Sequence, residues 1–181
     1  MALSGGQRIV QGLVDAHYVS LYRYAHRLTG SAADAEDLTQ DTFCKAQLKL
    51  EQLRDPERAK AWLFSILRNA YLHRVRAGHH PRFVSLDDLG DVAEPSPEPL
   101  PPVDPDKLQE ALNELPEVFR TPVILYYFEE FSYRAIAEQM ELPLGTVMSR
   151  LARARAHLRA RLLPPSPEVL ANGQRRQRDG L

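Results

Sequence analysis

The sequence predicts an all-α protein that consists of two small helical domains. Apolar residues recur at intervals of three and four on both sides of the chain's middle, and no segment alternates apolar and polar residues as a half-buried strand does. Between the two helical parts lies a proline-rich acidic stretch, DVAEPSPEPLPPVDP. Proline disfavours helix and like charges repel, so we expect this stretch to be a flexible linker.

The predicted boundaries divide the chain into four parts. They are an N-terminal domain at 1–80, the linker at 81–105, a C-terminal domain at 106–163 and a tail at 164–181. The tail begins with helix-breaking prolines and carries a cluster of arginines near its end, so we expect it to be disordered and basic.

A glycine separates the first two predicted helices of the N-terminal domain. Apolar residues recur at helical spacing from Val10 to Leu28, and Gly30 follows where a C-cap glycine would stand. Ser31 and Asp34 then match an N-terminal capping pattern, which indicates that a second helix starts there. The apolar side of this second helix consists of Ala35, Leu38, Thr42, Ala46, Leu50 and Leu53, with Phe43 at its margin.

A third helix is predicted from the dipeptide Asp55-Pro56 to Gly78. Aspartate is a favoured N-cap, and proline fits the first helical position because the N–H that it lacks would be unpaired there. Trp62 stands at helical spacing with Ile66, and we expect it to belong to the core.

The C-terminal domain is expected to contain four helices. Asp104 and Pro105 repeat the cap-then-proline signal for the first of them, and Pro116 opens the second. Pro122 falls in the second turn of that helix, where the loss of a backbone hydrogen bond should bend or shorten the helix start. Ser132 is expected to cap a short third helix.

The fourth helix of this domain, 144–162, carries five arginines and no acidic residue. When successive residues are placed 100° apart, its apolar residues form one stripe with arginines on both flanks. The stripe consists of Val147, Leu151, Ala154, Leu158 and Leu162. We therefore expect the stripe to dock the helix on its domain and the arginines to face outward.

A short helix, a three-residue turn and a longer helix with polar residues at its start are typical of a helix-turn-helix. In this motif the second helix enters the major groove, where the planar fork of arginine can bond both guanine O6 and N7. A solvated arginine-rich surface is the plain alternative, but the turn and the polar helix start favour DNA binding. The candidate contacts are Thr146, Ser149, Arg150 and Arg153 toward the groove, with Arg155 and Arg159 toward phosphates. His157 fits equally a partly buried histidine and a phosphate donor.

The formal net charge of −1 conceals a strong segregation of charge. Lys and Arg outnumber Asp and Glu by 11 to 8 in residues 1–80, are outnumbered 4 to 14 in 81–143, and outnumber them 8 to 2 in 144–181. Such asymmetry suggests distinct partners for distinct parts of the chain. We hypothesise that the acidic middle section restrains nonspecific DNA binding by the free protein, as a competitor for the basic helix.

Composition excludes several other classes of protein. No apolar run approaches the ~18 residues of a membrane span, and the N-terminus lacks the pattern of a secretory signal. The single cysteine, Cys44, cannot form an internal disulfide, which fits a reducing cytoplasm. The histidines lack metal-ligand spacing and no glycine-rich phosphate loop occurs, so we expect no metal, no cofactor and no enzymatic activity.

The segment YRAIAEQMELPLGTVMSRLARARAHLR resembles the promoter-reading fourth region of bacterial RNA polymerase sigma factors of the extracytoplasmic-function (ECF) group. Their signature runs approximately Y-x-x-I-A-x-x-x-x-x-P-x-G-T-V-x-S-R-x-x-R-A-R. Met148 stands where many members have a basic residue, and Ala152 where several have a larger one. The base preference of other members of the group therefore does not predict that of this chain.

The N-terminal domain resembles the same group independently. DAEDLTQDTFCKA is similar to its polymerase-binding second region, and AWLFSILRNAYLHRVR to its promoter-melting helix. The resemblance implies that the acidic face of the second helix docks on basic helices of the polymerase clamp, with Asp37, Gln40 and Asp41 as contacts.

The resemblance also implies that the third helix and the loop before it hold the opened downstream promoter element. The basic residues would bind the separated strand's phosphates, and Asn69 or the loop at 54–58 would contact a base. The candidate residues are Arg58, Lys60, Arg68, Asn69, Arg74 and Arg76.

Two functions stay open from the sequence. The first is a dissociable initiation subunit of RNA polymerase with promoter DNA and core polymerase as partners. The alternative is an autonomous helix-turn-helix transcriptional regulator, which would leave the DAEDLTQDTF and WLFSILRN motifs without a purpose. The resemblance further suggests an anti-sigma factor as a possible antagonist, because members of the group are commonly held inactive by one.

Overall fold

A computed structural model describes residues 5–77 and 103–163, and in these ranges the regular structure is entirely helical. The predicted all-α fold is confirmed. The predicted linker falls outside the described residues except at 103–105, and the predicted tail lies outside them altogether. Within the described ranges, no helix combines the length and the apolar character that crossing a membrane requires.

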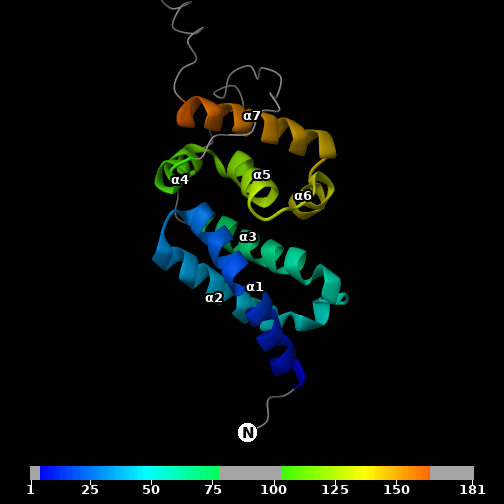
Figure 1. Cartoon of the computed structure of the whole chain (residues 1–181). Coiled ribbons are helices and arrows are strands. Elements are labelled where there is room, and N and C mark those ends of the chain that lie inside the picture. Colours follow the sequence, from blue (N-terminus) through cyan, green and yellow to red (C-terminus); the bar gives the residue numbers. More distant parts are fainter. Residues whose placement is uncertain (1–4, 78–102, 164–181) are drawn as a thin grey trace, which may run out of the picture.

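Each domain is a small bundle of helices (Figure 1). The N-terminal domain consists of α1 (Gly5–Thr29), α2 (Ala32–Leu48), the short 3₁₀ turns η1 (Leu50–Gln52) and η2 (Pro56–Arg58), and α3 (Ala59–Ala77). The C-terminal domain consists of α4 (Pro105–Glu114), α5 (Glu117–Tyr127), α6 (Tyr133–Met140) and α7 (Leu144–Leu162).

Side-chain caps define the helix starts that the sequence predicts. The Ser31 hydroxyl accepts a hydrogen bond from the Asp34 N–H at 3.3 Å, and the Ser132 hydroxyl accepts one from the Ala135 N–H at 3.1 Å. The Asp104 carboxylate caps α4 in the same way. These caps satisfy N–H groups that have no partner within the first turn of a helix.

Two details differ from the expectation. The helix α2 ends at Leu48, so the last two apolar residues assigned to it lie in and after η1 instead. Pro122 does not shorten α5, which begins at Glu117 and continues through the proline to Tyr127. The residues after Pro122 are buried, and their packing stabilises the helix despite the backbone hydrogen bond that proline cannot make.

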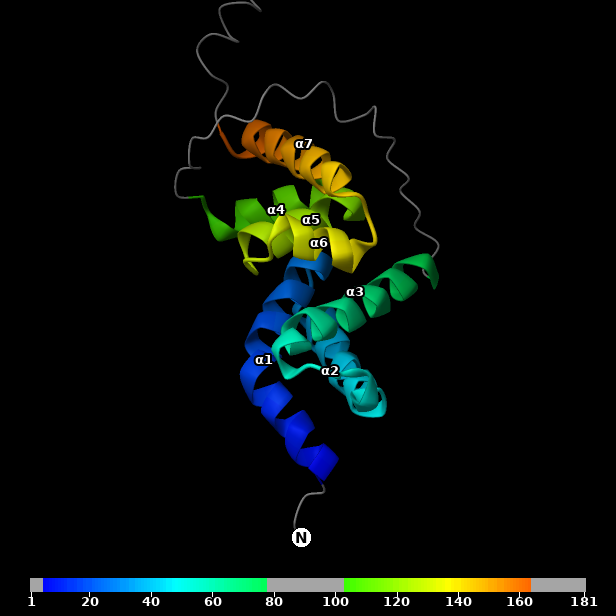
Figure 2. The same ribbon diagram turned by 90° about the vertical axis from the view of Figure 1, so that its right-hand side faces the viewer.

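The C-terminal domain lies directly on the N-terminal domain (Figures 1 and 2). Its helix α7 is on the outer side, and α4, α5 and α6 lie between α7 and the N-terminal helices. One end of α1 projects beyond the rest of the bundle. No pattern in the sequence predicts this contact between the two domains.

The segment 128–131, which joins α5 to α6 and is called here the connecting loop, makes much of this contact. The Arg27 guanidinium lies 4.0 Å from the centre of the Phe128 ring, and the Phe131 and Phe64 rings are 5.3 Å apart between centres. The Lys60 ammonium donates a hydrogen bond to the backbone carbonyl of Glu129 at 2.6 Å. Cation–π, aromatic and hydrogen-bond contacts therefore combine in four consecutive residues.

A second contact covers the C-terminal end of α1. The Arg120 guanidinium donates to the carbonyl of Leu28 at 2.7 Å, and the Gln109 amide donates to the carbonyl of Arg27 at 3.3 Å. Both acceptors lie in the last turn of α1, where carbonyls lack a helical partner and carry the negative end of the helix dipole. Side chains of α4 and α5 thus cap a helix of the other domain.

Glu129 is buried in the contact between the domains, with 5% of its surface exposed. Burial raises the pKa of its carboxyl to about 7, although the nearby cations Lys60, Arg27 and Arg23 oppose the shift. An ionised Glu129 is unfavourable in free energy here, because burial removes most of the hydration of its negative charge.

Replacing Gly30 by alanine should destabilise the protein. Gly30 has φ +69°, and a Cβ there would lie 2.8 Å from the Asn113 amide nitrogen. The left-handed conformation costs a residue with a Cβ about 1–2 kcal/mol. The matched control is Gly12→Ala in α1, where nothing lies within 4 Å; this change should stabilise the helix by about 0.5–1 kcal/mol. Urea unfolding followed by circular dichroism measures the free energy of unfolding of both variants. Equal changes in the two would contradict the special role of the Gly30 conformation.

The contact between the domains should weaken as the pH rises from 6 to 8. Glu129 has a pKa of about 7 in the contact and an ordinary value near 4.5 when exposed, so the closed arrangement holds more protons between these values. Raising the pH through this window removes the proton and favours separation. The charged groups that face Glu129 are Lys60 on α3, Arg23 and Arg27 on α1, and the adjacent Glu130.

Energy transfer between a dye on Cys44, which is exposed, and one on an introduced Lys107→Cys measures this separation. Glu129→Gln should remove most of the change between pH 6.5 and 8. A variant that keeps the full pH dependence would assign it to another group.

Candidate DNA and polymerase interfaces

The helix-turn-helix is built from α6, a tight turn and α7. Glu141 ends α6 in the left-handed conformation with φ 54°, and the Leu142 N–H donates to the Ala137 carbonyl at 3.0 Å. Ile136 and Met140 of α6 are buried together with the predicted stripe of α7. Within that stripe Val147, Leu151, Ala154 and Leu158 are buried and Leu162 is half-buried, so the prediction that it docks the helix is confirmed.

The start of α7 presents its polar residues outward. Ser149 is exposed, and its hydroxyl donates to the Thr146 carbonyl at 3.1 Å, which leaves the hydroxyl oxygen able to accept. Thr146 and Arg153 are half-buried. Among the described helices α7 lies on the outer side of the domain, away from the N-terminal helices.

The six α7 candidates do not share one environment. Arg150 is half-buried, and this burial lowers the pKa of its guanidinium while the charge of Glu117 raises it. Arg155 lines an apolar cavity of about 280 Å³ together with Tyr127 and Phe128. Arg159 is half-buried farther along the helix. Arg155 and Arg159 therefore differ in their surroundings from the residues at the helix start, and the division into base and phosphate contacts stays a prediction.

The end of α7 is tied to α4. The Arg161 guanidinium makes a two-pronged hydrogen bond with the Glu114 carboxylate, and His157 Nε2 lies 3.7 Å from the same group. The hydrogen bond from Arg161 lowers the pKa of Glu114. His157 is half-buried and adjoins an acidic partner, which favours its reading as a structural residue.

Three of the six candidate cations and polar residues around α3 face the C-terminal domain. Arg58 lies 3.2 Å from the Glu138 carboxylate, and Arg68 lies 3.6 Å from that of Glu117. Lys60 bonds the carbonyl of the connecting loop. The other three candidates, Asn69, Arg74 and Arg76, are exposed on the later turns of α3.

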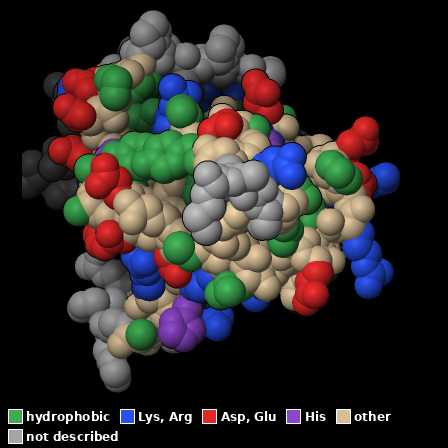
Figure 3. All heavy atoms as spheres, turned by 90° about the horizontal axis from the view of Figure 1, so that it is seen from below, with side chains coloured by type: hydrophobic (Ala, Val, Ile, Leu, Met, Phe, Trp, Pro, Cys, Tyr) green, Lys and Arg blue, Asp and Glu red, His purple; other side chains and the backbone are tan. Residues whose placement is uncertain are grey.

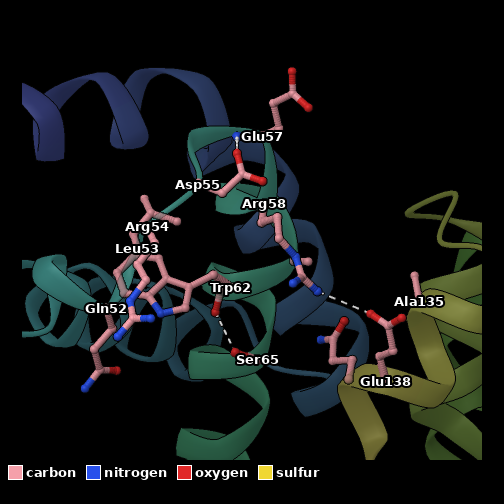
Figure 4. A pocket seen from close by; sticks show the side chains of 12 residues that line it. Gln52, Leu53, Arg54, Asp55, Glu57, Arg58, Trp62, Ser65, Ala135 and Glu138 are labelled. Atoms are coloured by element: carbon pink, nitrogen blue, oxygen red, sulfur yellow. Dashed lines mark hydrogen bonds and ion pairs between the residues drawn. The ribbon is translucent and has the colours of Figure 1, made fainter.

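A cavity of about 690 Å³ lies between the loop before α3 and the helix α6 (Figure 4). The N-terminal domain contributes Arg54, Arg58 and Trp62 to its walls, and α6 contributes Glu138 and Gln139. Trp62 is half-buried and lines this cavity, so the expectation that it belongs wholly to the core is only partly met. An aromatic ring beside two guanidinium groups is suited to holding an unstacked base.

The acidic face of α2 lies on the surface of the N-terminal domain. Asp37 and Gln40 are exposed, and Asp41 is partly covered because Lys45 and Arg74 lie 2.8 and 3.9 Å from its carboxylate. Seen from below, the molecule shows acidic and basic side chains interspersed (Figure 3). The predicted docking candidates are thus accessible, with Asp41 already in local ion pairs.

Sequence reasoning missed the acidic residues that engage α3. Glu117, Glu129 and Glu138 belong to the acidic middle section, which was recognised only as a total charge. Their partners are distant in the chain; Arg58 and Glu138, for example, are 80 residues apart. No spacing rule links such residues, so only the packing of the domains reveals them. In the described parts of the chain, no group of three or more His, Cys, Asp or Glu side chains could hold a metal ion.

Two family models match the chain in order. Sigma-70 region 2 matches residues 13–80, and Sigma-70 region 4 matches residues 106–158. The first covers the domain that carries the acidic face and α3, and the second covers the helix-turn-helix.

Named relatives agree with these matches. The ECF RNA polymerase sigma factor SigE of Mycolicibacterium smegmatis is 37% identical over 162 residues, which cover 87% of this chain and 63% of that protein. The chain thus spans somewhat less than two thirds of this relative. The ECF RNA polymerase sigma factor SigL of Mycobacterium tuberculosis is 34% identical over 157 residues, which cover 85% of this chain and 89% of that protein.

Solved structures show the same architecture. The sigma factor RpoE of Bartonella quintana, in complex with the anti-sigma factor NepR, aligns with a TM-score of 0.66 and 31% identity over 83% of this chain and 94% of that one. CnrH in complex with the cytosolic domain of CnrY gives a TM-score of 0.63 and 28% identity over 87% and 89%. Both regions match in order, and the 34% identical SigL is covered over 89% of its length, so the chain belongs to the ECF group of RNA polymerase sigma factors.

Proposed function

We propose that this protein is a dissociable initiation subunit that binds core RNA polymerase and directs it to specific promoters. The observation that carries the proposal is the ordered presence of regions 2 and 4 in one chain, since an autonomous regulator needs only the helix-turn-helix. In this role the protein performs no catalysis and acts in the cytoplasm, where polymerase and chromosome are.

Promoter recognition is assigned to two surfaces. The start of α7, with Thr146, Ser149, Arg150 and Arg153, would read the upstream element in the major groove. The residues around α3 would hold the opened downstream element, with Arg74 and Arg76 on strand phosphates and Asn69 or the 54–58 loop at a base. The cavity beside Trp62 supports the loop as the place where a base is held, because stacking needs an exposed ring face.

Polymerase docking is assigned to the acidic face of α2. Charged groups arranged to complement a basic partner steer encounter and fix register. Asp37 and Gln40 are exposed and would contact the polymerase directly. Asp41 would first have to release its ion pairs with Lys45 and Arg74.

An anti-sigma factor is a further expected partner. The RpoE relative was solved in complex with one, and it aligns with this chain over both domains. Copurification with the endogenous protein from its native cells would identify such an antagonist.

Arg153→Ala and Arg159→Ala should weaken promoter binding in different ways. If Arg153 reads a base edge, its loss should cost about 1–3 kcal/mol and relax preference at one base pair. Loss of a phosphate contact at Arg159 should weaken all sequences alike and reduce the salt slope by about one. Holoenzyme binding to a promoter found by transcript mapping, and to its single-base variants at several salt concentrations, measures both. Identical behaviour of the two variants would refute the division of α7.

Asp37→Arg should weaken binding to core polymerase about tenfold, which corresponds to ~1.4 kcal/mol, because it replaces attraction by repulsion at the docking face. Folding should be intact, since Asp37 is exposed. The matched control is Glu110→Arg, the same charge reversal at an exposed position of α4. Titration of labelled protein with core enzyme measures the affinity. Normal binding by Asp37→Arg would refute the proposal that the acidic face of α2 docks on the polymerase. If the unaltered chain does not bind core polymerase, the autonomous regulator is favoured.

A further inference from the structure

The start of α7 exposes two large apolar side chains. Leu144 is 46% exposed and Met148 is 50% exposed, whereas the neighbouring large apolar residues Val147 and Leu151 are buried. Residues four apart lie on one side of a helix, so Leu144 and Met148 form one apolar strip on its outer surface. Because Val147 and Leu151 already dock the helix on its domain, the packing of the domain does not account for this strip.

The position of Met148 distinguishes it from an ordinary exposed apolar residue. Scattered single ones are normal on a protein surface and need no explanation. Met148, however, directly precedes the exposed Ser149 on the second helix of the helix-turn-helix. This helix carries five arginines and no acidic residue, and it lies on the outer side of the domain (Figure 2). The apolar strip is thus continuous with the surface assigned to the upstream element, and its basic surroundings favour DNA as the partner.

The residues exposed at the helix start are not the ones that the sequence pattern favours. Thr146 and Arg150 are half-buried. Burial lowers the pKa of the Arg150 guanidinium, and the charge of Glu117 on α5 opposes that shift, so Arg150 lies partly against the domain. The residues of the first turns that are fully classed as exposed are Leu144, Gly145, Met148 and Ser149.

The helical neighbours of Met148 are small on its outward side. Gly145 stands three residues before it and Ala152 four residues after it, and both positions adjoin Met148 on the helix surface. Nothing lies within 4 Å of the place where a Cβ of Gly145 would stand. The methionine side chain therefore stands clear of its neighbours on this face of α7.

The chemistry of methionine restricts what it can recognise in a major groove. Its thioether donates no hydrogen bond and accepts only weakly. Guanine presents acceptors there, adenine an acceptor and a donor, cytosine a donor, and thymine an acceptor beside its C5-methyl group. The methyl group is the one apolar group among these, and contact with it removes apolar surface of both partners from water. A flexible, unbranched side chain adapts readily to such a group.

We propose that Met148 is a specificity-determining residue whose side chain contacts the C5-methyl group of a thymine in the major groove of the upstream element. The inference rests on the proposed function, in which α7 enters that groove, and adds the chemistry of one base position. Leu144 extends the same apolar strip by one helical turn. Hydrogen-bond readout by Ser149 and methyl readout by Met148 then come from consecutive residues.

Replacing thymine by uracil tests the proposal, because uracil lacks only the methyl group. Each thymine of the mapped upstream element, on either strand, is replaced in turn, and binding of the duplex by holoenzyme with the full chain is measured. We expect one replacement to weaken binding about fourfold, which is roughly the effect of burying one methyl group. Met148→Ala should bind the thymine and uracil duplexes equally at that position. Met148→Leu should keep the preference, since leucine retains an apolar side chain of similar size.

The matched control is Ile9→Ala, which truncates an apolar side chain of similar exposure, 53%, on α1. Its holoenzyme should show the same fourfold loss with uracil as the unaltered one. A second pair of duplexes carries cytosine or 5-methylcytosine at the sensitive position. The added methyl group should strengthen binding by the unaltered holoenzyme and leave binding by Met148→Ala unchanged.

Three results would overturn the proposal. They are tolerance of uracil at every position, a full uracil effect in Met148→Ala, and an equal loss by Met148→Ala for thymine and uracil duplexes. The second result would assign the methyl contact to another residue, and the third would assign Met148 to a contact outside the bases. If the unaltered holoenzyme does not prefer the mapped element to a scrambled duplex, the proposed function itself is refuted. That failure is distinguishable because it is seen before any thymine is replaced.

Discussion

The arrangement of the whole molecule depends on the connecting loop at 128–131 and the surface that receives it. Phe131 packs on Phe64, which in turn stacks on the buried Tyr24 with ring centres 4.9 Å apart. The Glu129 carbonyl receives the Lys60 ammonium. Because the same loop joins α5 to α6, its position fixes where the helix-turn-helix stands relative to the N-terminal domain. The aromatic contacts bury apolar surface between the domains, and the hydrogen bond from Lys60 fixes the position of the loop on α3.

The acidic middle section gains a specific meaning from this packing. Its total charge suggested that it could compete with DNA for the basic helix at 144–162. In the described residues two of its folded members, Glu117 on α5 and Glu138 on α6, pair instead with Arg68 and Arg58 of the N-terminal domain. A carboxylate fixed 3–4 Å from a guanidinium competes far more effectively than one on a loose chain, because no ordering entropy opposes the contact.

Whether a structural feature can be predicted from the sequence depends on how far apart in the chain its interacting residues lie. Helix starts at Ser31, Asp104 and Ser132 followed from local hydrogen bonding, and the α7 stripe followed from periodicity, so the sequence predicted them correctly. Pro122 does not shorten α5, because burial of the residues that follow it outweighs one lost backbone hydrogen bond. The interdomain hydrogen bonds were missed because their residues lie 69 to 92 apart in the chain and obey no local rule.

The chemical nature of each contact determines how the packing of the two domains responds to salt. Arg58 and Glu138 are exposed, so salt screens their attraction and this ion pair contributes little to holding the domains together. Lys60 bonds a neutral carbonyl, which salt affects less, and Phe64 and Phe131 are insensitive to it. High salt should therefore leave the domains together while it weakens DNA binding at every surface. At high salt the ring contact of Phe64 with Phe131 and the hydrogen bond from Lys60 to the Glu129 carbonyl therefore hold the domains together more than the exposed ion pair does.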